Sequence, residues 1–130
     1  MYQTVTQGIK VCVNPSYLDS ESDPDEQHFV WKYEVEITNL TPQPVQLLSR
    51  YWRIIDADGR VQEVQGQGVV GQQPVIEPGA IFHYASGCPL TTDSGFMQGH
   101  YEMTSDKDGP FLVDIPLFSL DLPDSGRTLN

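Results

Sequence analysis

Apolar and polar residues alternate along much of this chain, and this alternation constrains the fold more than any other feature of the sequence. Between residues 28 and 38 the sequence HFVWKYEVEIT places apolar side chains at the odd positions from Phe29 to Ile37 and polar side chains at the even positions from Lys32 to Thr38. A period of two is the spacing of a β-strand that has one face in a core and the other in water. The segment is therefore predicted to be a half-buried strand of an antiparallel sheet.

Further segments with strand-like character follow one another along the chain, separated by turn residues. Besides residues 28–38, strands are predicted over residues 9–14, 45–56, 60–65, 74–76, 80–88, 97–104 and 110–122. The dipeptide Asp58-Gly59 favours a tight hairpin in which both residues take positive φ. In the last segment the alternation shifts by one residue at Pro116, which predicts a β-bulge. Because the sequence contains no convincing amphipathic helix of three turns, the chain is predicted to fold as an all-β sandwich of seven or eight antiparallel strands.

The composition limits the classes of partner. The 130 residues fit one domain over residues 1–130, with a tail after about residue 123 that is expected to fray. Seven Lys and Arg residues against 18 Asp and Glu residues give a net charge of −11, which disfavours nucleic acid and anionic membranes as partners. The chain has no signal-peptide pattern and no apolar run of about 18 residues, so we expect a cytoplasmic protein without a membrane-inserted segment. Cys12 and Cys88 are expected to be reduced thiols.

The sequence GQGVVG, with Gly66, Gly68 and Gly71, fits the glycine pattern of dinucleotide-binding loops. In those proteins the glycines open a helix whose N-terminus holds the pyrophosphate. Here Pro74 and Pro78 follow closely and exclude such a helix. The three glycines are therefore predicted to shape a strand end or a tight connection. Because consecutive backbone N–H groups in a turn can form an anion nest, a bound phosphate or carboxylate remains the alternative.

His83 and His100 are candidate metal ligands. If residues 80–88 and 97–104 pair as an antiparallel hairpin, His83 faces His100 on the outer surface, with Glu102 diagonal to them. Two imidazoles and a carboxylate can hold a divalent metal, whereas two solvent-exposed histidines are the simpler interpretation. The acidic segment DSESDP resembles a calcium loop only in its spacing of carboxylates, because the glycine and the bidentate glutamate are missing, and it is predicted to be a solvated loop.

The sequence offers no catalytic group that can be assigned, but it offers two adjacent aromatic residues. No serine or cysteine lies in a nucleophile motif, and no acid–base pair can be placed, so an enzyme is not predicted. Tyr51 and Trp52 are neighbours and must point to opposite faces of a strand, which leaves one ring away from the main core. A ring exposed beside Arg50 or Arg53 would mark a protein-binding patch, since Tyr, Trp and Arg dominate interface hot spots.

Residues 49–103, SRYWRIIDADGRVQEVQGQGVVGQQPVIEPGAIFHYASGCPLTTDSGFMQGHYEM, resemble the signature stretch of the ApaG family of small bacterial proteins. The flanking runs FVWKYEVEITNLTPQPVQLLSRYW and FLVDIPLFSLDLP also match its pattern, so the resemblance covers nearly the whole chain. It implies an immunoglobulin/fibronectin type III-like sandwich and a cytosolic protein without an established biochemical activity, associated with cobalt tolerance and magnesium efflux. The matching motifs are the three glycines and the Tyr51-Trp52 pair, whereas His83 is not a feature of the family.

These observations favour a non-enzymatic protein-interaction or regulatory module, linked by the resemblance to divalent cation (cobalt and magnesium) homeostasis. Its expected partner is a protein of unknown identity that contacts Tyr51 or Trp52, and no cofactor is expected. The first alternative is a small anion or nucleotide phosphate at Gly66, Gly68 and Gly71, and the second is direct metal binding at the histidines. Edge strands leave a homodimer open.

Overall fold

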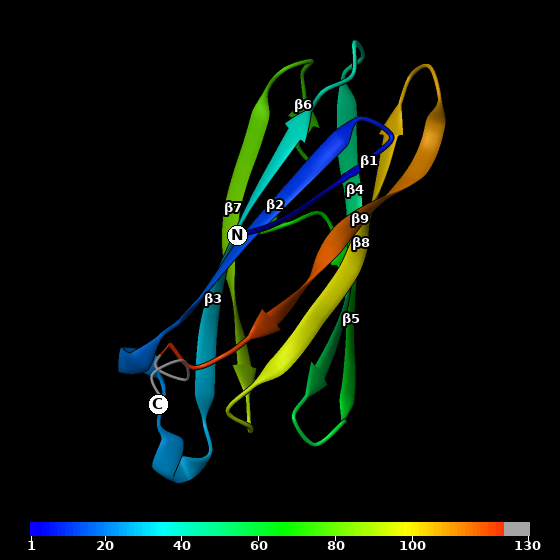
Figure 1. Ribbon diagram of the computed structural model, residues 1–130. Coiled ribbons are helices and arrows are strands. Elements are labelled where there is room, and N and C mark those ends of the chain that lie inside the picture. Colours follow the sequence, from blue (N-terminus) through cyan, green and yellow to red (C-terminus); the bar gives the residue numbers. More distant parts are fainter. Residues whose placement is uncertain (124–130) are drawn as a thin grey trace.

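Two antiparallel β-sheets pack face to face in the computed structural model, which describes residues 1–123 (Figure 1). The first sheet has the order β1 (Tyr2–Thr6), β2 (Ile9–Tyr17), β3 (Phe29–Asn39) and β7 (Ile81–Leu90). The second has the order β5 (Val61–Gln67), β4 (Val45–Asp56), β8 (Gly95–Ser105) and β9 (Gly109–Leu120), and β6 (Val75–Ile76) also pairs with β4. Two 3₁₀ helices, η1 (Asp19–Glu21) and η2 (Pro24–Glu26), lie between β2 and β3. None of the helices in residues 1–123 has the length and apolar character needed to cross a membrane.

The predicted fibronectin type III-like sandwich is confirmed, but the described residues form nine strands and not seven or eight. The strand that the sequence did not reveal is β1, which pairs with β2 from Tyr2 opposite Val13 to Thr6 opposite Ile9. Its connection to β2 is the dipeptide Gln7-Gly8, with φ of 49° and 80°. Positive φ at both positions is the geometry of a type I′ hairpin, which matches the twist of the two strands. The expected fraying of the tail concerns residues beyond 123 and lies outside the described part of the chain.

The core is built from the inward-facing residues of both sheets. Along β3 the odd-numbered residues from Trp31 to Ile37 are buried, as the alternation predicted. From the other sheet, Tyr101 and Phe118 are at most 1% exposed. Burying an aromatic or aliphatic side chain of this size contributes about 1.5–3 kcal/mol. The hydrophobic pairing of the two inner faces therefore holds the sandwich together.

Two β-bulges shift the alternation within the second sheet. Met97 pairs with Phe118 and Gly99 pairs with Ile115, so β9 contains one extra residue in the region of Pro116, and the predicted bulge is confirmed. The second bulge was not predicted. Leu47 of β4 pairs with Met103, but Ser49 pairs with Glu102, which leaves Leu48 as an extra residue. After Leu48 the even-numbered residues of β4 point into the core.

The hairpin between β4 and β5 was predicted at Asp58-Gly59, but its turn differs from the expected type. Gly59 has a φ of 84°, whereas Asp58 is not among the residues with positive φ. The backbone N–H of Asp56 donates to the carbonyl of Arg60 at 3.0 Å, which closes a three-residue loop. The carboxylate of Asp56 accepts the N–H groups of Asp58 and Arg60, both at 2.9 Å. These side-chain contacts favour the longer loop over a two-residue turn.

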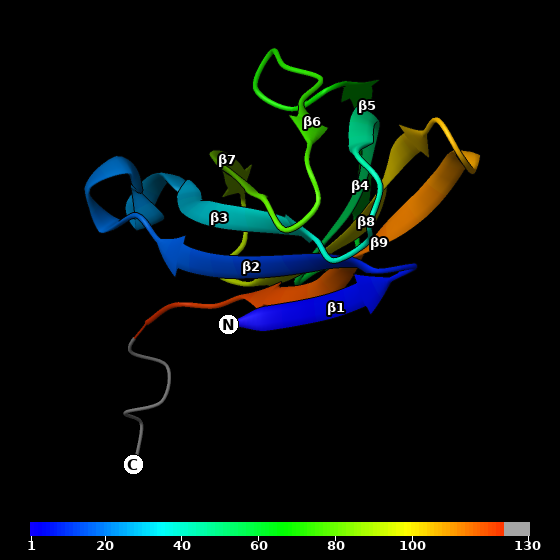
Figure 2. The same cartoon turned by 90° about the horizontal axis from the view of Figure 1, so that it is seen from above.

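The two sheets meet along one side and diverge along the other. Strands β1 and β2 of the first sheet contact β9 of the second, and Figure 2 shows these strands side by side. A hydrogen bond of 3.2 Å from the N–H of Asp114 to the hydroxyl of Thr6 ties β9 to β1. On the other side, β7 and β5 are the last strands of their sheets and lie apart in Figure 2. A crevice lined by residues of β5 and β7 opens between these two strands.

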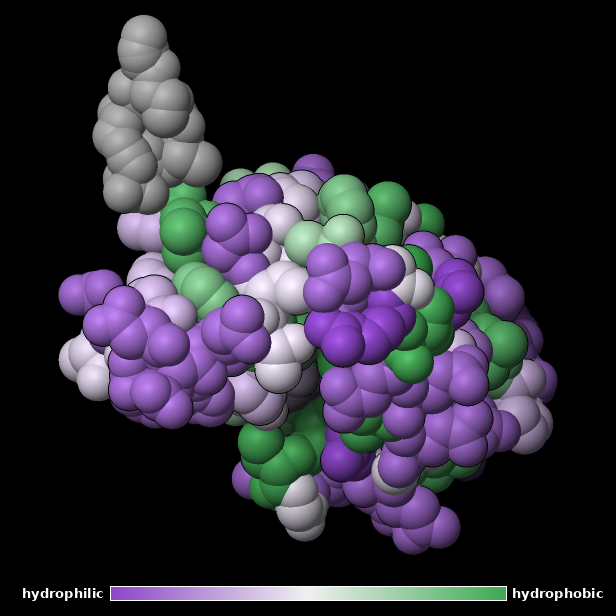
Figure 3. Space-filling view, turned by 90° about the horizontal axis from the view of Figure 1, so that it is seen from below, coloured by the Kyte–Doolittle hydropathy of each residue, from purple (hydrophilic) through white to green (hydrophobic). Residues whose placement is uncertain are grey.

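Figure 3 looks onto the end of the sandwich that carries the two 3₁₀ helices and the β4–β5 hairpin. Hydrophilic residues cover most of this end, with hydrophobic groups in patches between them. Neither 3₁₀ helix contains a buried residue, and both have acidic residues in their first turn. The segment around Asp19–Glu26 is thus a solvated acidic loop, as its sequence predicted.

Candidate functional site

Tyr51 and Trp52 point to opposite faces of β4, as their adjacency required. Trp52 is 3% exposed, and its ring packs edge-on against Tyr33 at a centroid distance of 5.1 Å and against Phe118 at 5.9 Å. Trp52 is therefore a core residue, and the prediction of Trp52 as an exposed anchor is wrong. The bulge at Leu48 determines which of the two rings is buried, because it turns Trp52 inward and Tyr51 outward.

Tyr51 lies on the outer face of the second sheet and contacts side chains from both neighbouring strands. Its ring stacks on His100 of β8, with centroids 4.9 Å apart and an interplanar angle of 25°. Its hydroxyl donates to Oε2 of Glu63 on β5 at 2.5 Å. The hydrogen bond to Glu63 raises the pKa of Tyr51 above its ordinary value. The ring is thus held in a fixed orientation while its outer surface remains accessible.

A shallow depression of about 540 Å³ surrounds the Tyr51–His100 pair. Its walls come from strands β4, β5, β8 and β9 and include Ser49, Gln65, Glu102 and Leu112. The hydroxyl of Ser49 donates to Oε1 of Glu102 at 3.3 Å, and Leu112 is 53% exposed. An aromatic stack, an apolar side chain and carboxylates therefore share one open surface.

The alternative of a metal site at His83, His100 and Glu102 does not fit the structure, because the two strands assumed to pair do not pair. His83 lies on β7 opposite Glu36 of β3, and its Nδ1 is 3.7 Å from a carboxylate oxygen of Glu36. His100 lies on β8 opposite Tyr51, in the other sheet. The neighbours Tyr84 and Tyr101 point inward and touch each other, so the two histidines point outward from opposite faces of the sandwich. Within residues 1–123 no group of three His, Cys, Asp or Glu side chains could hold a metal ion.

Each of the three motif glycines has a conformational or steric role. A Cβ on Gly66 would lie 2.7 Å from Nη1 of Arg50, and a Cβ on Gly68 would lie 2.2 Å from the backbone oxygen of Gln72. Gly71 has a φ of 80° and follows Val70 with a φ of 43°. Positive φ at both residues forms the two-residue turn that joins Val69 and Gln72. The glycines therefore shape the connection between β5 and β6, which agrees with the structural interpretation of the motif.

The amide groups of this glycine connection are largely engaged within the protein. The N–H of Gly68 donates to the carbonyl of Leu48 at 2.8 Å. The N–H groups of Val69 and Gln72 donate to each other's carbonyl oxygens at 2.8 and 2.9 Å. An anion at the loop would have to use the remaining amides or displace these bonds. Anion binding by the loop itself therefore stays a prediction that this geometry does not favour.

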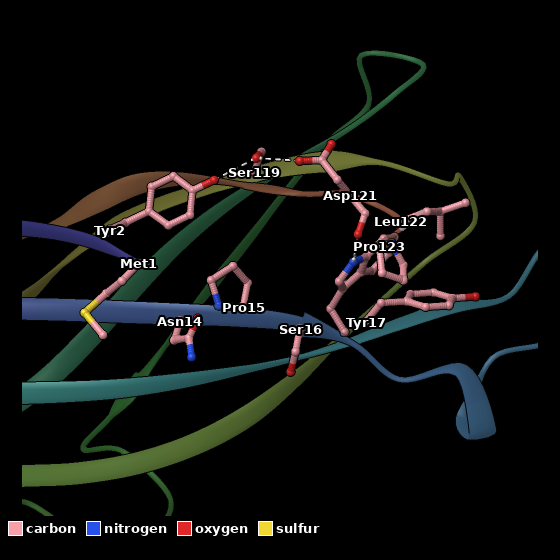
Figure 4. Close-up of a pocket in the computed structure, with 11 residues that line it drawn as sticks. Met1, Tyr2, Asn14, Pro15, Ser16, Tyr17, Ser119, Asp121, Leu122 and Pro123 are labelled. Atoms are coloured by element: carbon pink, nitrogen blue, oxygen red, sulfur yellow. Dashed lines mark hydrogen bonds between the residues drawn. The ribbon is translucent and has the colours of Figure 1, made fainter. Parts of the chain in front are cut away.

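A second pocket, of about 440 Å³, lies where the chain leaves β9 (Figure 4). Tyr2 donates to the hydroxyl of Ser119 at 2.9 Å, and Ser119 donates to the carboxylate of Asp121 at 2.7 Å. The indole N–H of Trp31 donates to the carbonyl of Asp121 at 2.9 Å. Sequence reasoning missed this pocket because one wall comes from the start of β1. Its polar contacts fix the segment after β9 against the first sheet, which is a structural role.

Tyrosine hydroxyls join the two sheets at the centre of the sandwich. The hydroxyls of Tyr84 on β7 and Tyr101 on β8 lie 2.5 Å apart. Burial raises the pKa of both phenols, so both are neutral in the folded protein near neutral pH.

Burial also raises the pKa of the Cys88 thiol to about 11. Cys12 and Cys88 are both free and buried, and the neutral thiol of Cys88 is a poor nucleophile.

The family model described as the ApaG domain matches residues 19–105 of this chain. The chain belongs to the ApaG family. It is 55% identical over 130 residues to Protein ApaG of Brucella suis biovar 1, and the match covers 100% of both chains. It also resembles a crystal structure of a Bordetella pertussis protein described as ApaA, with 46% identity and a TM-score of 0.85 over 94% of this chain and 96% of that one.

A further X-ray structure, of a structural genomics target, superposes with a TM-score of 0.87 at 36% identity over 95% of this chain and 93% of that one. These similarities extend over the glycine connection, the Tyr51 face and both sheets. Membership of the ApaG family therefore agrees with the observed fold, and the names of these relatives specify no molecular activity.

Proposed function

We propose that this member of the ApaG family is a non-catalytic protein-interaction module, and that it binds its partner on the outer face of the second sheet around Tyr51. The observation that carries the proposal is the Tyr51–His100 stack, which lies in an open depression and is held from below by its own sheet. Tyrosine is enriched at the centres of protein interfaces because it adds a large contact area and loses little conformational entropy.

The charges around Tyr51 favour a partner segment with basic residues. Glu63 and Glu102 lie beside the stack, and Asp114 of β9 pairs with His100 in register. Among the ion pairs of the described residues, none involves these three carboxylates. The whole chain carries a net charge of −11. A partner segment with Lys or Arg next to an apolar residue would complement both the carboxylates and the exposed Leu112.

In this proposal the partner protein, and not the sandwich itself, accounts for the link to cobalt and magnesium homeostasis. The resemblance to the family implies the link, but His83 and His100 of this chain point away from each other. Regulation through a bound protein requires no metal ligands on the sandwich itself. Binding of a nucleotide phosphate by the glycine connection is less well supported, because three of its amides already donate to backbone carbonyls.

Site-specific photo-crosslinking in cells tests the proposal. A photoreactive residue is placed at Gln65, beside Tyr51, and in a matched protein at Ala85, which is exposed on the outer face of the other sheet. We expect a discrete adduct only from position 65. The captured protein is then purified, and its affinity is measured for the wild type, Tyr51→Ala and Ile81→Ala.

The Tyr51→Ala change is expected to weaken binding by about tenfold or more, whereas Ile81→Ala on β7 should leave the affinity unchanged. Equal crosslinking from positions 65 and 85 would contradict the proposal. So would an affinity that is insensitive to Tyr51→Ala in a protein that remains folded.

A further inference from the structure

A crevice opens onto the inner face of the sandwich at the side where the two sheets diverge. It has a volume of about 180 Å³ and lies between the edge strands β7 and β5, with parts of β3, β4 and β8 behind them. Its polar lining consists of Tyr33, Arg50, Gln62, Ser86 and Cys88. At about 30 Å³ for each water molecule, this space suits a small polar group and excludes a large rigid ligand.

The Leu48 bulge and Gly66 together place a cation in this crevice. After the bulge Arg50 faces inward, on the same side of β4 as the buried Trp52. Arg50 pairs in register with Gly66 of β5, where the missing side chain leaves room for the guanidinium group. Nη1 of Arg50 donates to the carbonyls of Gln67 at 3.2 Å and Gly68 at 2.9 Å. These bonds fix the guanidinium group and leave Nε and Nη2 without a hydrogen-bond partner among the described residues.

The charge of Arg50 is not neutralised by an acidic residue. Among the ion pairs of residues 1–123, none includes Arg50, and the crevice lining contains no Asp or Glu. Burial raises the pKa of Tyr33 and Cys88, so both groups remain uncharged near neutral pH. A guanidinium group in a partly desolvated crevice attracts an anion more strongly than one on an open surface.

A hydroxyl group lines the same crevice from β7, the edge strand of the other sheet. Ser86 of β7 pairs in register with Tyr33 and lies on the inward side of its strand, and Gln62 adds an amide at the mouth. Guanidinium, hydroxyl and amide groups that line one small space form the kind of donor set that recognises phosphate and carboxylate oxygens. We propose that this crevice binds a small oxyanion, a phosphate or a carboxylate group, between Arg50 of β4 and Ser86 of β7.

The site differs from the anion nest suggested by the glycine pattern, because its donors are side chains and its opening lies between the sheets. In this arrangement Gly66 and Gly68 act through Arg50: the first leaves space for the guanidinium group and the second accepts one of its hydrogen bonds. The crevice and the proposed interaction surface are distinct, since the Arg50 and Tyr51 side chains alternate along β4, but Arg50 borders both of them.

Nuclear magnetic resonance titration tests the site directly. Sodium phosphate and sodium acetate are each added to the labelled full-length protein at constant pH and ionic strength, and the Nε–Hε signals of Arg50 and Arg53 are followed with the backbone amides. We expect saturable shifts in the millimolar range at Arg50 and Ser86 and none at Arg53, which lies on the outer face. A response to phosphate alone or to acetate alone identifies the preferred oxyanion, and both support the site. Equal shifts at Arg53, shifts confined to residues 68–72, or no shift at Arg50 and Ser86 would overturn it.

Matched variants separate a specific site from a general effect of charge. Arg50→Gln and Arg53→Gln remove the same charge from neighbouring positions of one strand. Arg50→Gln is expected to weaken oxyanion binding by about tenfold or more, whereas Arg53→Gln should leave it unchanged. Ser86→Ala leaves the Arg50 contacts intact and should weaken binding several-fold, which keeps the test valid if Arg50→Gln unfolds. Unchanged affinity in Ser86→Ala, or equal losses in the two arginine variants, would reject the proposal.

Discussion

Gly66 lies directly beside the guanidinium group of Arg50, and a Cβ at residue 66 would come within 2.7 Å of Nη1 and 3.0 Å of Cζ. Arg50 is held there by two hydrogen bonds to the carbonyls of Gln67 and Gly68. The absence of a side chain at residue 66 therefore leaves the space that the guanidinium group of Arg50 occupies. This relationship explains one residue of the GQGVVG motif without any ligand.

Replacing Gly66 with alanine should displace Arg50 and break its two hydrogen bonds. We expect Gly66→Ala to lower the free energy of unfolding by about 1–2 kcal/mol, measured by urea denaturation. Gly87→Ala on β7 is the control, because its added Cβ would meet its nearest atom at 3.5 Å, an ordinary contact. In an Arg50→Ala background the cost of Gly66→Ala should nearly vanish. An equal cost in both backgrounds would show that Gly66 acts through another neighbour.

The other two motif glycines should differ in their sensitivity to substitution. Gly68 combines a φ of 67° with a hypothetical Cβ only 2.2 Å from the backbone oxygen of Gln72. Gly71 has a φ of 80° but open space around it. We therefore expect Gly68→Ala to cost about 3 kcal/mol of stability and Gly71→Ala about 1 kcal/mol. Gly71→Asn should be better tolerated than Gly71→Ala, because asparagine adopts positive φ more readily. Similar costs at residues 68 and 71 would contradict this order.

The adjacent aromatic residues of β4 should separate stability from binding. Trp52→Ala removes a ring that packs between Tyr33 and Phe118, and it is expected to cost about 3–5 kcal/mol. Tyr51→Ala removes an outward ring, and it should cost less than about 1 kcal/mol. Chemical denaturation monitored by circular dichroism measures both values. A large loss for Tyr51→Ala would mean that the ring serves the fold, and its role in the proposed interface would need a milder variant such as Tyr51→Phe.

Strands with strict alternation of apolar and polar residues could be predicted from the sequence. A β-bulge could be predicted only where the sequence itself shows a shift in that alternation. Around Pro116 two alternating runs are separated by one residue, so the bulge is evident from the pattern. Around Leu48 the run VQLLSRYWRII has apolar residues on both faces, and the pattern is compatible with either inward or outward Tyr51. The pairing of β4 with β8 therefore determines whether Tyr51 or Trp52 enters the core, and the local sequence does not encode this pairing.

The error at the histidines has a different cause. Strands β7 and β8 are consecutive and joined by a short connection, and consecutive antiparallel strands commonly form a hairpin. Here the connection crosses from one sheet to the other, so Tyr84 and Tyr101 face each other across the core and the histidines diverge. The connecting residues TTDS give no signal that distinguishes a crossing from a hairpin. The Arg50 crevice was missed for the same reason, since its walls belong to both sheets.

The hydroxyls of Tyr84 and Tyr101 should show strong energetic coupling. Replacing either residue with phenylalanine leaves the other hydroxyl buried without its partner, so each single change is expected to cost about 1–3 kcal/mol. The double variant should cost clearly less than the sum of the two single changes, because it leaves no unpaired hydroxyl. Urea denaturation of the four proteins gives the coupling energy. Additive costs would show that each hydroxyl is satisfied by another group.

The thiol of Cys88 should make the protein lose stability in alkaline solution. Burial raises its pKa from 9.0 to about 11, so the folded state disfavours the thiolate. Well below pH 9 the Cys88 thiol is protonated in both the folded and the unfolded protein, so its full contribution to the free energy of unfolding is present. Between pH 9 and pH 11 the thiol ionises in the unfolded chain but not yet in the folded protein, so the free energy of unfolding falls. Since one pKa unit corresponds to about 1.4 kcal/mol, the wild type should lose about 2 kcal/mol more than Cys88→Ala over this interval. Both proteins contain the buried tyrosines, so comparing them isolates the contribution of Cys88. If the free energy of unfolding depended on pH in the same way in both proteins, the burial of a neutral thiol would be contradicted.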